Sequence, residues 1–205
     1  GAAEDCIEYM QKLSAADGTP EWSKTMPTGL WSCRVITDGS FFCGWSMAES
    51  DGTLDFGNGI TVASEASKAG IVKFDTNGDA LWAKATASHS FSDLSVSADG
   101  TVLVIIGSGA SYYDPASATR ISTAAGSEGT VLWTDQGGVG SHGFRGVEVT
   151  DDNLEVFVFG QVTGEETLTD TNGLETKLRT RGSYEAFVAA YNASDGSGKY
   201  AMDGG

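Results

Sequence analysis

The sequence predicts an all-β protein built from repeated four-stranded units. Short apolar runs broken by Gly, Asp, Asn and Ser recur along the whole chain, and no long amphipathic helical stretch is visible. Glycine makes up 28 of the 205 residues, roughly twice its usual share of about 7%. Many turns between short strands explain this composition.

The best-formed hairpin in the sequence runs from Gly70 to Trp82. A short apolar strand leads into an Asn77-Gly78 turn, and a second strand is centred on Trp82. Asn-Gly between two apolar runs is the strongest short-range hairpin signal, because both residues accept the positive φ that tight turns demand. We therefore predict a β-hairpin over this stretch.

Three further segments share the layout of this hairpin. Each has an apolar strand, a polar turn and then an aromatic residue, over residues 7–22, 118–133 and 186–200; the copy at 118–133 is the most degraded. The four aromatic residues mark the repeat boundaries near Trp22, Trp82, Trp133 and Tyr200. Such self-similarity at a period of about 50 to 65 residues indicates a repeat architecture.

A second recurring unit lies between these hairpins, at residues 35–44, 94–107 and 147–160. Each copy has a strand, an Asp-Gly or Asp-Asn turn, a more apolar strand and a closing glycine. The strands at 102–106 and 156–159 are continuously apolar, which predicts sheets covered on both faces. Variable loops are expected after the closing glycines, at 46–67, 108–118 and 161–184.

Counting these elements gives about 14 strands, or roughly 3.5 four-stranded blades of the kind that pack face to face in a β-propeller. A β-sandwich is the alternative fold, but it does not require such repetition. Since a propeller closes with about four to eight blades, we expect residues 1–205 to form a single propeller segment, an incomplete ring belonging to a longer protein.

The repeats resemble those of the seven-bladed β-propeller repeat proteins. The resemblance rests on Ala186–Ala189, on Gly70–Asp75 with Gly78 and Trp82, and on Val158–Gly164, and it covers nearly the whole chain. Its motifs are structural, so the resemblance implies a fold and scarcely an activity. The sequence departs from the family pattern in the short unit around Cys43 and in the degraded hairpin at 118–133.

A second, weaker resemblance concerns residues 13–22, which are similar to the tryptophan-docking repeat of quinoprotein-type propellers. In such a repeat, a turn precedes an indole ring that packs across to the neighbouring blade. No cofactor-binding set accompanies this segment.

The charge balance limits the classes of molecule that the protein is expected to bind. With 12 basic and 28 acidic residues, the net charge is −16, which argues against nucleic acid and anionic membranes as partners. No apolar run approaches the length of about 18 residues that a membrane-spanning helix needs, so no membrane insertion is expected. We expect a secreted or cell-surface protein, as the repeat family implies.

Cys33 and Cys43 flank the Asp38-Gly39 turn and are candidates for a disulfide. The register matters, because ideal pairing around a two-residue turn sets Cys43 opposite Arg34. A disulfide among the three cysteines and buried free thiols are the two alternatives. Cys6 would then be unpaired or bonded elsewhere.

Asn192-Ala193-Ser194 is the only N-glycosylation sequon, and it lies on a predicted exposed turn. Asn192 is therefore a candidate glycosylation site if a eukaryote secretes the protein. The alternative is a structural role in the turn, since Asn is a favoured turn residue.

The Asp- and Asn-rich stretches at 75–79, 150–153 and 169–173 superficially resemble the start of a calcium loop. They lack the 12-residue spacing and the terminal bidentate Glu of an EF-hand, and ordinary turn chemistry explains their composition. We predict no cofactor and no metal site, with calcium as the one candidate ion.

Catalytic constellations are hard to find in this sequence. His89 and His142 share no metal-ligand spacing, and the neighbours Ser141 and His142 do not have the geometry of a nucleophile and its base. We therefore predict no catalytic residue.

Tyr112, Tyr113, Trp31 and Trp45 could line a sugar-binding surface, although aromatic residues more often fill the space between blades. The sequence favours a non-catalytic extracellular structural or interaction module, whose variable loops contact proteins or glycans, within a surface assembly. Its partners would be other chains or remaining blades of the same protein. The alternative is a propeller enzyme, a hydrolase, lyase or quinoprotein-like protein, with its site in the central channel.

Overall fold

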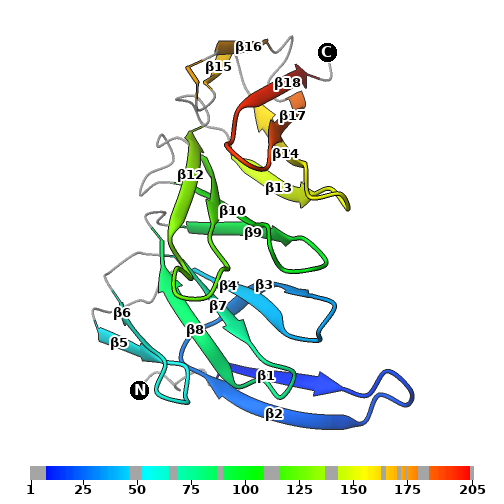
Figure 1. Ribbon diagram of the computed structural model, residues 1–205, viewed down its shortest axis with the longest axis vertical. Coiled ribbons are helices and arrows are strands. Elements are labelled where there is room, and N and C mark those ends of the chain that lie inside the picture. Colours follow the sequence, from blue (N-terminus) through cyan, green and yellow to red (C-terminus); the bar gives the residue numbers. More distant parts are fainter. Residues whose placement is uncertain are drawn as a thin grey trace, which may run out of the picture.

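Short antiparallel strands, labelled β1 to β18, make up the fold (Figure 1). The structure is a computed structural model that describes residues 8–46, 52–64, 69–86, 90–108, 116–136, 143–162, 165–169, 172–173, 175–179 and 185–203. These residues form no helix, and thus no helix that could cross a membrane. The predicted all-β class is confirmed.

Three four-stranded blades follow one another along the chain, from the bottom to the top of Figure 1. The first blade consists of β3 (Leu30–Val35), β4 (Phe41–Trp45), β7 (Gly70–Phe74) and β8 (Ala80–Ala85). The second consists of β9 (Ser90–Val96), β10 (Leu103–Ser108), β11 (Ser117–Ile121) and β12 (Val131–Gln136). The third consists of β13 (Phe144–Val149), β14 (Glu155–Val162), β17 (Glu185–Asn192) and β18 (Gly198–Asp203). Ahead of them, β1 (Glu8–Leu13) and β2 (Pro20–Met26) form a two-stranded half-blade.

Two additional hairpins lie where the sequence predicted only variable loops. One is β5 (Gly52–Asp55) with β6 (Thr61–Ser64), between β4 and β7. The other is β15 (Glu165–Thr169) with β16 (Glu175–Arg179), between β14 and β17; it joins the edge of the second blade through a pairing of β15 with β12. The expected total of about 14 strands was therefore too low, because it omitted these two hairpins.

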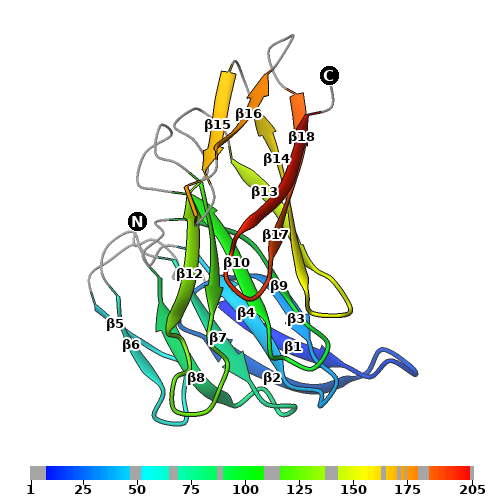
Figure 2. The same cartoon turned by 45° about the horizontal axis from the view of Figure 1, so that its top comes forward.

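The connections between strands are of two kinds, which lie at opposite ends of the strands. We call these the short-turn end and the long-connection end. Because consecutive strands are antiparallel, the turns after the first and third strand of each blade lie at the short-turn end. The connections after the second strand lie at the long-connection end. The turns at the short-turn end are closed by backbone hydrogen bonds, and the longest covers residues 122–130. The two additional hairpins are inserted in connections of the long-connection end (Figure 2).

The hairpin at 70–82 is present, but its turn differs from a tight turn in which both central residues take positive φ. Gly78 has a φ of 74°, whereas Asn77 is not in the left-handed region. Asp75 N–H donates to the Asp79 carbonyl at 2.9 Å, and Gly78 N–H donates to the Asp75 carbonyl at 3.1 Å. This is the three-residue loop in which only the last residue is left-handed.

Apolar side chains between successive blades form the core in three clusters. The first joins the half-blade to the first blade and includes Met26 and Phe74, the second joins the first and second blades, and the third joins the second and third blades. Val102 to Ile106 are buried throughout, as their apolar run predicts. At 156–159 the prediction of two covered faces was wrong, because Val156 and Val158 are buried but Phe159 is 44% exposed.

Candidate interaction surfaces

The four outer hairpins, β1–β2, β7–β8, β11–β12 and β17–β18, share one register. In each, the ladder shifts by one residue near the end of the first strand, and the preceding position pairs with an aromatic residue on the second strand. The pairs are Lys12 with Trp22, Lys73 with Trp82, Arg120 with Trp133 and Ala190 with Tyr200. The four aromatic positions identified in the sequence are therefore structurally equivalent.

Two of these aromatic residues dock on the turn of the next outer hairpin. Trp22 Nε1 donates to the Thr76 carbonyl at 3.2 Å, and Trp133 Nε1 donates to the Ala193 carbonyl at 3.0 Å. The Trp22 ring also covers Gly78, where an added Cβ would lie 2.7 Å from the ring. The indoles thus connect neighbouring blades, as the resemblance to tryptophan-docking repeats implies.

The residue after each ladder shift faces the preceding blade. Phe74, Ile121 and Tyr191 occupy this position in the three full blades, and all three are buried. Leu13 occupies it in the half-blade and is 52% exposed. We call Tyr9, Leu13 and the turn 14–19 the N-terminal face, because this surface corresponds to one that the preceding blade buries elsewhere in the chain.

The opposite end of the blade series exposes the outward side of β14, β17 and β18. Tyr200 is 45% exposed and Met202 is 55% exposed, whereas Trp133, the equivalent of Tyr200, is only 6% exposed. Ladder pairing places Phe159, Val188 and Met202 side by side, and Phe157 meets Tyr200 edge to face with 6.3 Å between ring centroids. We call Phe157, Phe159, Val188, Tyr200 and Met202 the C-terminal face.

Polar contacts join the innermost strands β3, β9 and β13. Ser32 Oγ donates to Asp93 Oδ1 at 2.8 Å, and Arg34 Nη2 lies 3.2 Å from the same oxygen. Further along, Val149 N–H donates to Ser95 Oγ at 3.0 Å. Each contact pairs a residue with its neighbour in the next blade, so these groups hold blades together.

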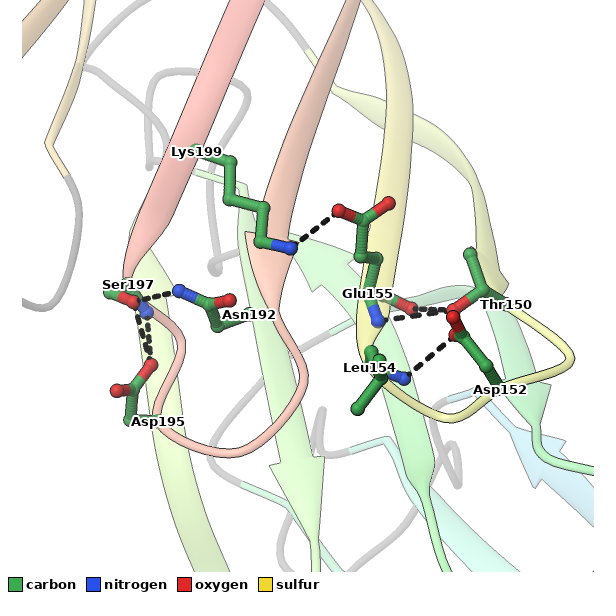
Figure 3. A network of polar contacts seen from close by, with 8 residues as sticks. All are labelled: Thr150, Asp152, Leu154, Glu155, Asn192, Asp195, Ser197 and Lys199. Atoms are coloured by element: carbon green, nitrogen blue, oxygen red, sulfur yellow. Dashed lines mark hydrogen bonds and ion pairs between the residues drawn. The ribbon is translucent and has the colours of Figure 1, made fainter.

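The short turns are closed by their own aspartates, as Figure 3 shows for the third blade. Asp152 accepts hydrogen bonds from the Thr150 hydroxyl and from Leu154 N–H, and these bonds, the hydroxyl first, lower its pKa. Asp195 accepts from Ser197 N–H and the Ser197 hydroxyl, which lower its pKa in that order. The ion pair of Lys199 with Glu155 links the two hairpins (Figure 3).

These turn contacts bear on the calcium hypothesis. Asp75 Oδ1 accepts hydrogen bonds from the backbone N–H of Asn77 and of Asp79, both at 2.8 Å. The described part of the chain contains no group of three or more His, Cys, Asp or Glu residues that could hold a metal ion. In the stretch 169–173, residues 170 and 171 lie outside the described residues.

A disulfide joins Cys33 of β3 to Cys43 of β4, and the two residues are direct ladder partners. The register expected for a two-residue turn was wrong, because the loop has three residues. Ile36 N–H donates to the Ser40 carbonyl, and Gly39, with a φ of 82°, supplies the left-handed position. Cys6 lies outside the described residues.

Asn192 is half-buried at the end of β17, in contrast to the exposed position expected for the sequon. Its backbone N–H donates to the Ser197 carbonyl at 2.8 Å, and its side-chain amide donates to the Ser197 hydroxyl. The next carbonyl, that of Ala193, accepts from Trp133. The asparagine therefore has a structural role in a turn to which the neighbouring blade is docked.

The four aromatic residues proposed for a sugar-binding surface do not form one group. Trp45 is 1% exposed and packs against Phe56 with 5.1 Å between ring centroids, so it belongs to the core between the half-blade and the first blade, the alternative expected for such aromatic residues. Trp31 is exposed on β3, while Tyr112 and Tyr113 lie outside the described residues. A cavity lined by residues of β15 to β18 has a volume of about 30 Å³, far below the roughly 300 Å³ or more of typical ligand pockets.

No known protein-family profile matches the chain, and no curated protein matches it by sequence. Solved structures do match. They include the Dos1 propeller (TM-score 0.53, 9% identity, 95% of this chain and 54% of that one) and a hydrazine synthase of Kuenenia stuttgartiensis (TM-score 0.51, 16% identity, 93% and 58%).

A third similar structure is the complex of KlAtg21 with the coiled coil of AgAtg16 (TM-score 0.52, 7% identity, 96% and 65%). The chain spans about half the length of the first two structures and about two thirds of the third. At such low identity the likeness concerns the fold alone, and that fold is a β-propeller, present here as three four-stranded blades and a half-blade.

Proposed function

We propose that this chain is a non-catalytic structural and interaction module whose exposed faces bind other protein chains or the remaining blades of the same protein. The C-terminal face is the observation that carries this proposal. Three of its large apolar side chains, Phe159, Tyr200 and Met202, are about half-exposed side by side. Contiguous exposed apolar patches on folded proteins mark sites of protein contact.

The connections at the long-connection end of the strands provide a second candidate binding surface. The hairpins β5–β6 and β15–β16 are inserted in these connections. Each packs a few apolar residues against the blades, such as Phe56 and Leu178, and exposes other positions to solvent. Loops on a rigid scaffold are common binding elements, so we propose contacts with proteins or glycans there. The similar structure of KlAtg21 is described as a complex with a coiled coil, which fits a protein partner.

We infer further that the protein is secreted or displayed on a cell surface and belongs to the seven-bladed repeat proteins. The Cys33–Cys43 disulfide supports the location, because disulfides persist in oxidising compartments. The shared register of the four outer hairpins supports the family. A glycan on Asn192 would have to be attached before the turn folds, because the side-chain amide is engaged with Ser197.

Site-specific photo-crosslinking in the source organism tests the interaction proposal. A photoreactive residue replaces Met202 on the C-terminal face, and a matched control carries it at Leu132, which is 50% exposed on β12. We expect a defined protein adduct from position 202, lost when Tyr200→Asp is added, and a weaker or absent adduct from position 132. Equal adducts from both positions, or none from position 202, would refute the assignment of this face.

A further inference from the structure

The innermost strands β3, β9 and β13 each carry a one-residue bulge near their start. In the second and third blades, pairing with the next strand skips Ser92 and Arg145. In the first blade it skips Trp31 and Ser32. A bulge takes one residue out of the ladder and re-aims its side chain. Trp31, Ser92 and Arg145 are structurally equivalent, because each follows an apolar residue that pairs across the ladder. These preceding residues are Leu30, Phe91 and Phe144.

All three equivalent residues are exposed, and we call Trp31, Ser92 and Arg145 the bulge row. Trp31 is 71% exposed, and Ser92 and Arg145 are exposed as well. Ser92 lies in the second blade, which has a full blade on each side, so its exposure does not result from a missing neighbour. The bulge itself therefore turns this position toward solvent.

The residues that follow the bulges meet one another and keep the bulge row together. Ser32 Oγ donates to Asp93 Oδ1 at 2.8 Å, and a Cβ added at Gly146 would lie 3.9 Å from Asp93 Oδ2. Asp93 thus contacts both neighbouring innermost strands, which lie on either side of β9 in Figure 1. Its carboxylate is paired with Arg34 at 3.2 Å. The bulge row lies at the start of three adjacent strands, at the long-connection end.

The bulge row combines an indole ring, a hydroxyl group and a guanidinium group. An exposed indole offers a flat apolar face on which a sugar ring can pack. The hydroxyl of Ser92 donates and accepts hydrogen bonds, and the guanidinium of Arg145 donates them. No carboxylate of the described residues pairs with Arg145, so its N–H donors remain for a ligand.

Charge and distance limit the ligand. The net charge of −16 repels an anionic chain, and the guanidinium of Arg145 repels a cation, which favours an uncharged ligand. Packed sheets lie about 10 Å apart, and Trp31 and Arg145 are two blades apart. A ligand that contacts both is therefore extended. A chain of several neutral sugar units has apolar ring faces for the indole and hydroxyl groups for the two polar side chains.

We propose that the bulge row binds a neutral oligosaccharide of several units. Trp31 packs on one sugar ring, Ser92 forms a hydrogen bond near the middle of the chain, and Arg145 donates to hydroxyl groups further along. The inference rests on the proposed function, because it names the ligand class and the residues for the glycan contact at the long-connection end.

An oligosaccharide array probed with the purified chain tests the inference. The array carries neutral oligosaccharides of glucose, mannose, galactose and N-acetylglucosamine, with acidic oligosaccharides beside them. We expect the chain to retain neutral oligosaccharides of several units and not single sugars. In calorimetric titrations with the best-retained neutral oligosaccharide, Trp31→Ala should weaken binding at least about tenfold. Ser92→Ala and Arg145→Ala should each weaken it about two- to tenfold, because each removes a hydrogen bond.

Val35→Ala is the matched control for Trp31→Ala. Val35 is 70% exposed on the same strand but lies near the short-turn end, so this variant should bind like the wild type. Trp31→Phe keeps a flat ring and should retain part of the affinity. Circular dichroism of each variant verifies that a loss of binding is not a loss of folding.

Three results would overturn the inference: an array that retains no neutral oligosaccharide, an array that retains only acidic ones, or binding that Trp31→Ala leaves unchanged. In the first two cases, a protein adduct from position 202 would leave the proposed function standing. In the third case, glycan contact would stand and would belong to a surface other than the bulge row.

Discussion

Aspartates at the short turns accept hydrogen bonds from their own turns, and these bonds lower their pKa values. Asp99 accepts hydrogen bonds from the Ser97 hydroxyl, from the Thr101 N–H and hydroxyl, and from the Asn153 amide of the next blade, and these bonds lower its pKa to about 2. Hydrogen bonds within or across their turns likewise lower the pKa of Asp17, Asp38, Asp75, Asp152 and Asp195. A run of acidic turn residues thus reflects backbone capping.

These lowered pKa values make acid stability a direct test of the turns. An aspartate whose pKa is lower in the folded state stabilises the fold above its ordinary pKa near 3.8, and that contribution is lost as the pH falls through the folded value. We expect the free energy of unfolding, from urea titrations, to fall between pH about 4 and about 2. Asp99→Asn should flatten part of this slope, and parallel pH profiles for variant and wild type would contradict the prediction.

At the scale of elements, a glycine and an indole fix the spacing of neighbouring blades. Gly78 and Gly18 share a φ of 74°, but only Gly78 is covered by a ring, that of Trp22. The two positions therefore separate the cost of a left-handed backbone from the cost of lost space between blades.

Gly18→Ala should destabilise the protein by about 1 kcal/mol, the cost of placing a residue with a Cβ in the left-handed region. Gly78→Ala carries the same cost and adds about 1–3 kcal/mol, because its methyl group must displace the Trp22 ring. Chemical denaturation of both variants measures the difference. Equal losses at the two positions would show that the ring moves aside freely.

For the whole molecule, charge opposes the stacking of blades. The chain carries 28 acidic and 12 basic residues, so repulsion outweighs the attraction of ion pairs such as Lys24 with Asp79. Apolar clusters between successive blades overcome this repulsion. Stability of the whole should therefore depend on ionic strength.

Raising the salt concentration from low to near 1 M should raise the Tm by about 2–4 °C, equivalent to about 1 kcal/mol for a chain of this length. Salt screens the net repulsion more than it weakens the few exposed ion pairs. Calorimetric scans in sodium chloride measure the effect. A fall in Tm with salt would mean that the ion pairs outweigh the repulsion.

The sequence predicted the order of strands and the aromatic positions well, because turn chemistry and apolar runs are local signals. It missed β5–β6 and β15–β16, whose short strands, such as Thr61–Ser64, are polar or interrupted. An apolar run also cannot tell whether a second face is covered, so the sequence did not predict the exposure of Phe159. The register that the four outer hairpins share could be found only from the strand pairing in the structure. A one-residue shift in pairing does not show in the spacing of residues along the sequence.

The separation of short turns from long connections also decides where this scaffold tolerates new sequence. At the short-turn end of the strands, hydrogen bonds such as that from Thr37 N–H to the Ala98 carbonyl at 2.8 Å join successive blades. A residue inserted there would shift the blades relative to each other. At the long-connection end, doubling the length of a loop lowers the stability of the fold by only about 0.6 kcal/mol, through the entropy of closing the loop. The turn of β15–β16, where Gly173 has a φ of 78° and an added Cβ would meet no atom within 4 Å, is thus a natural place to graft a foreign peptide for display.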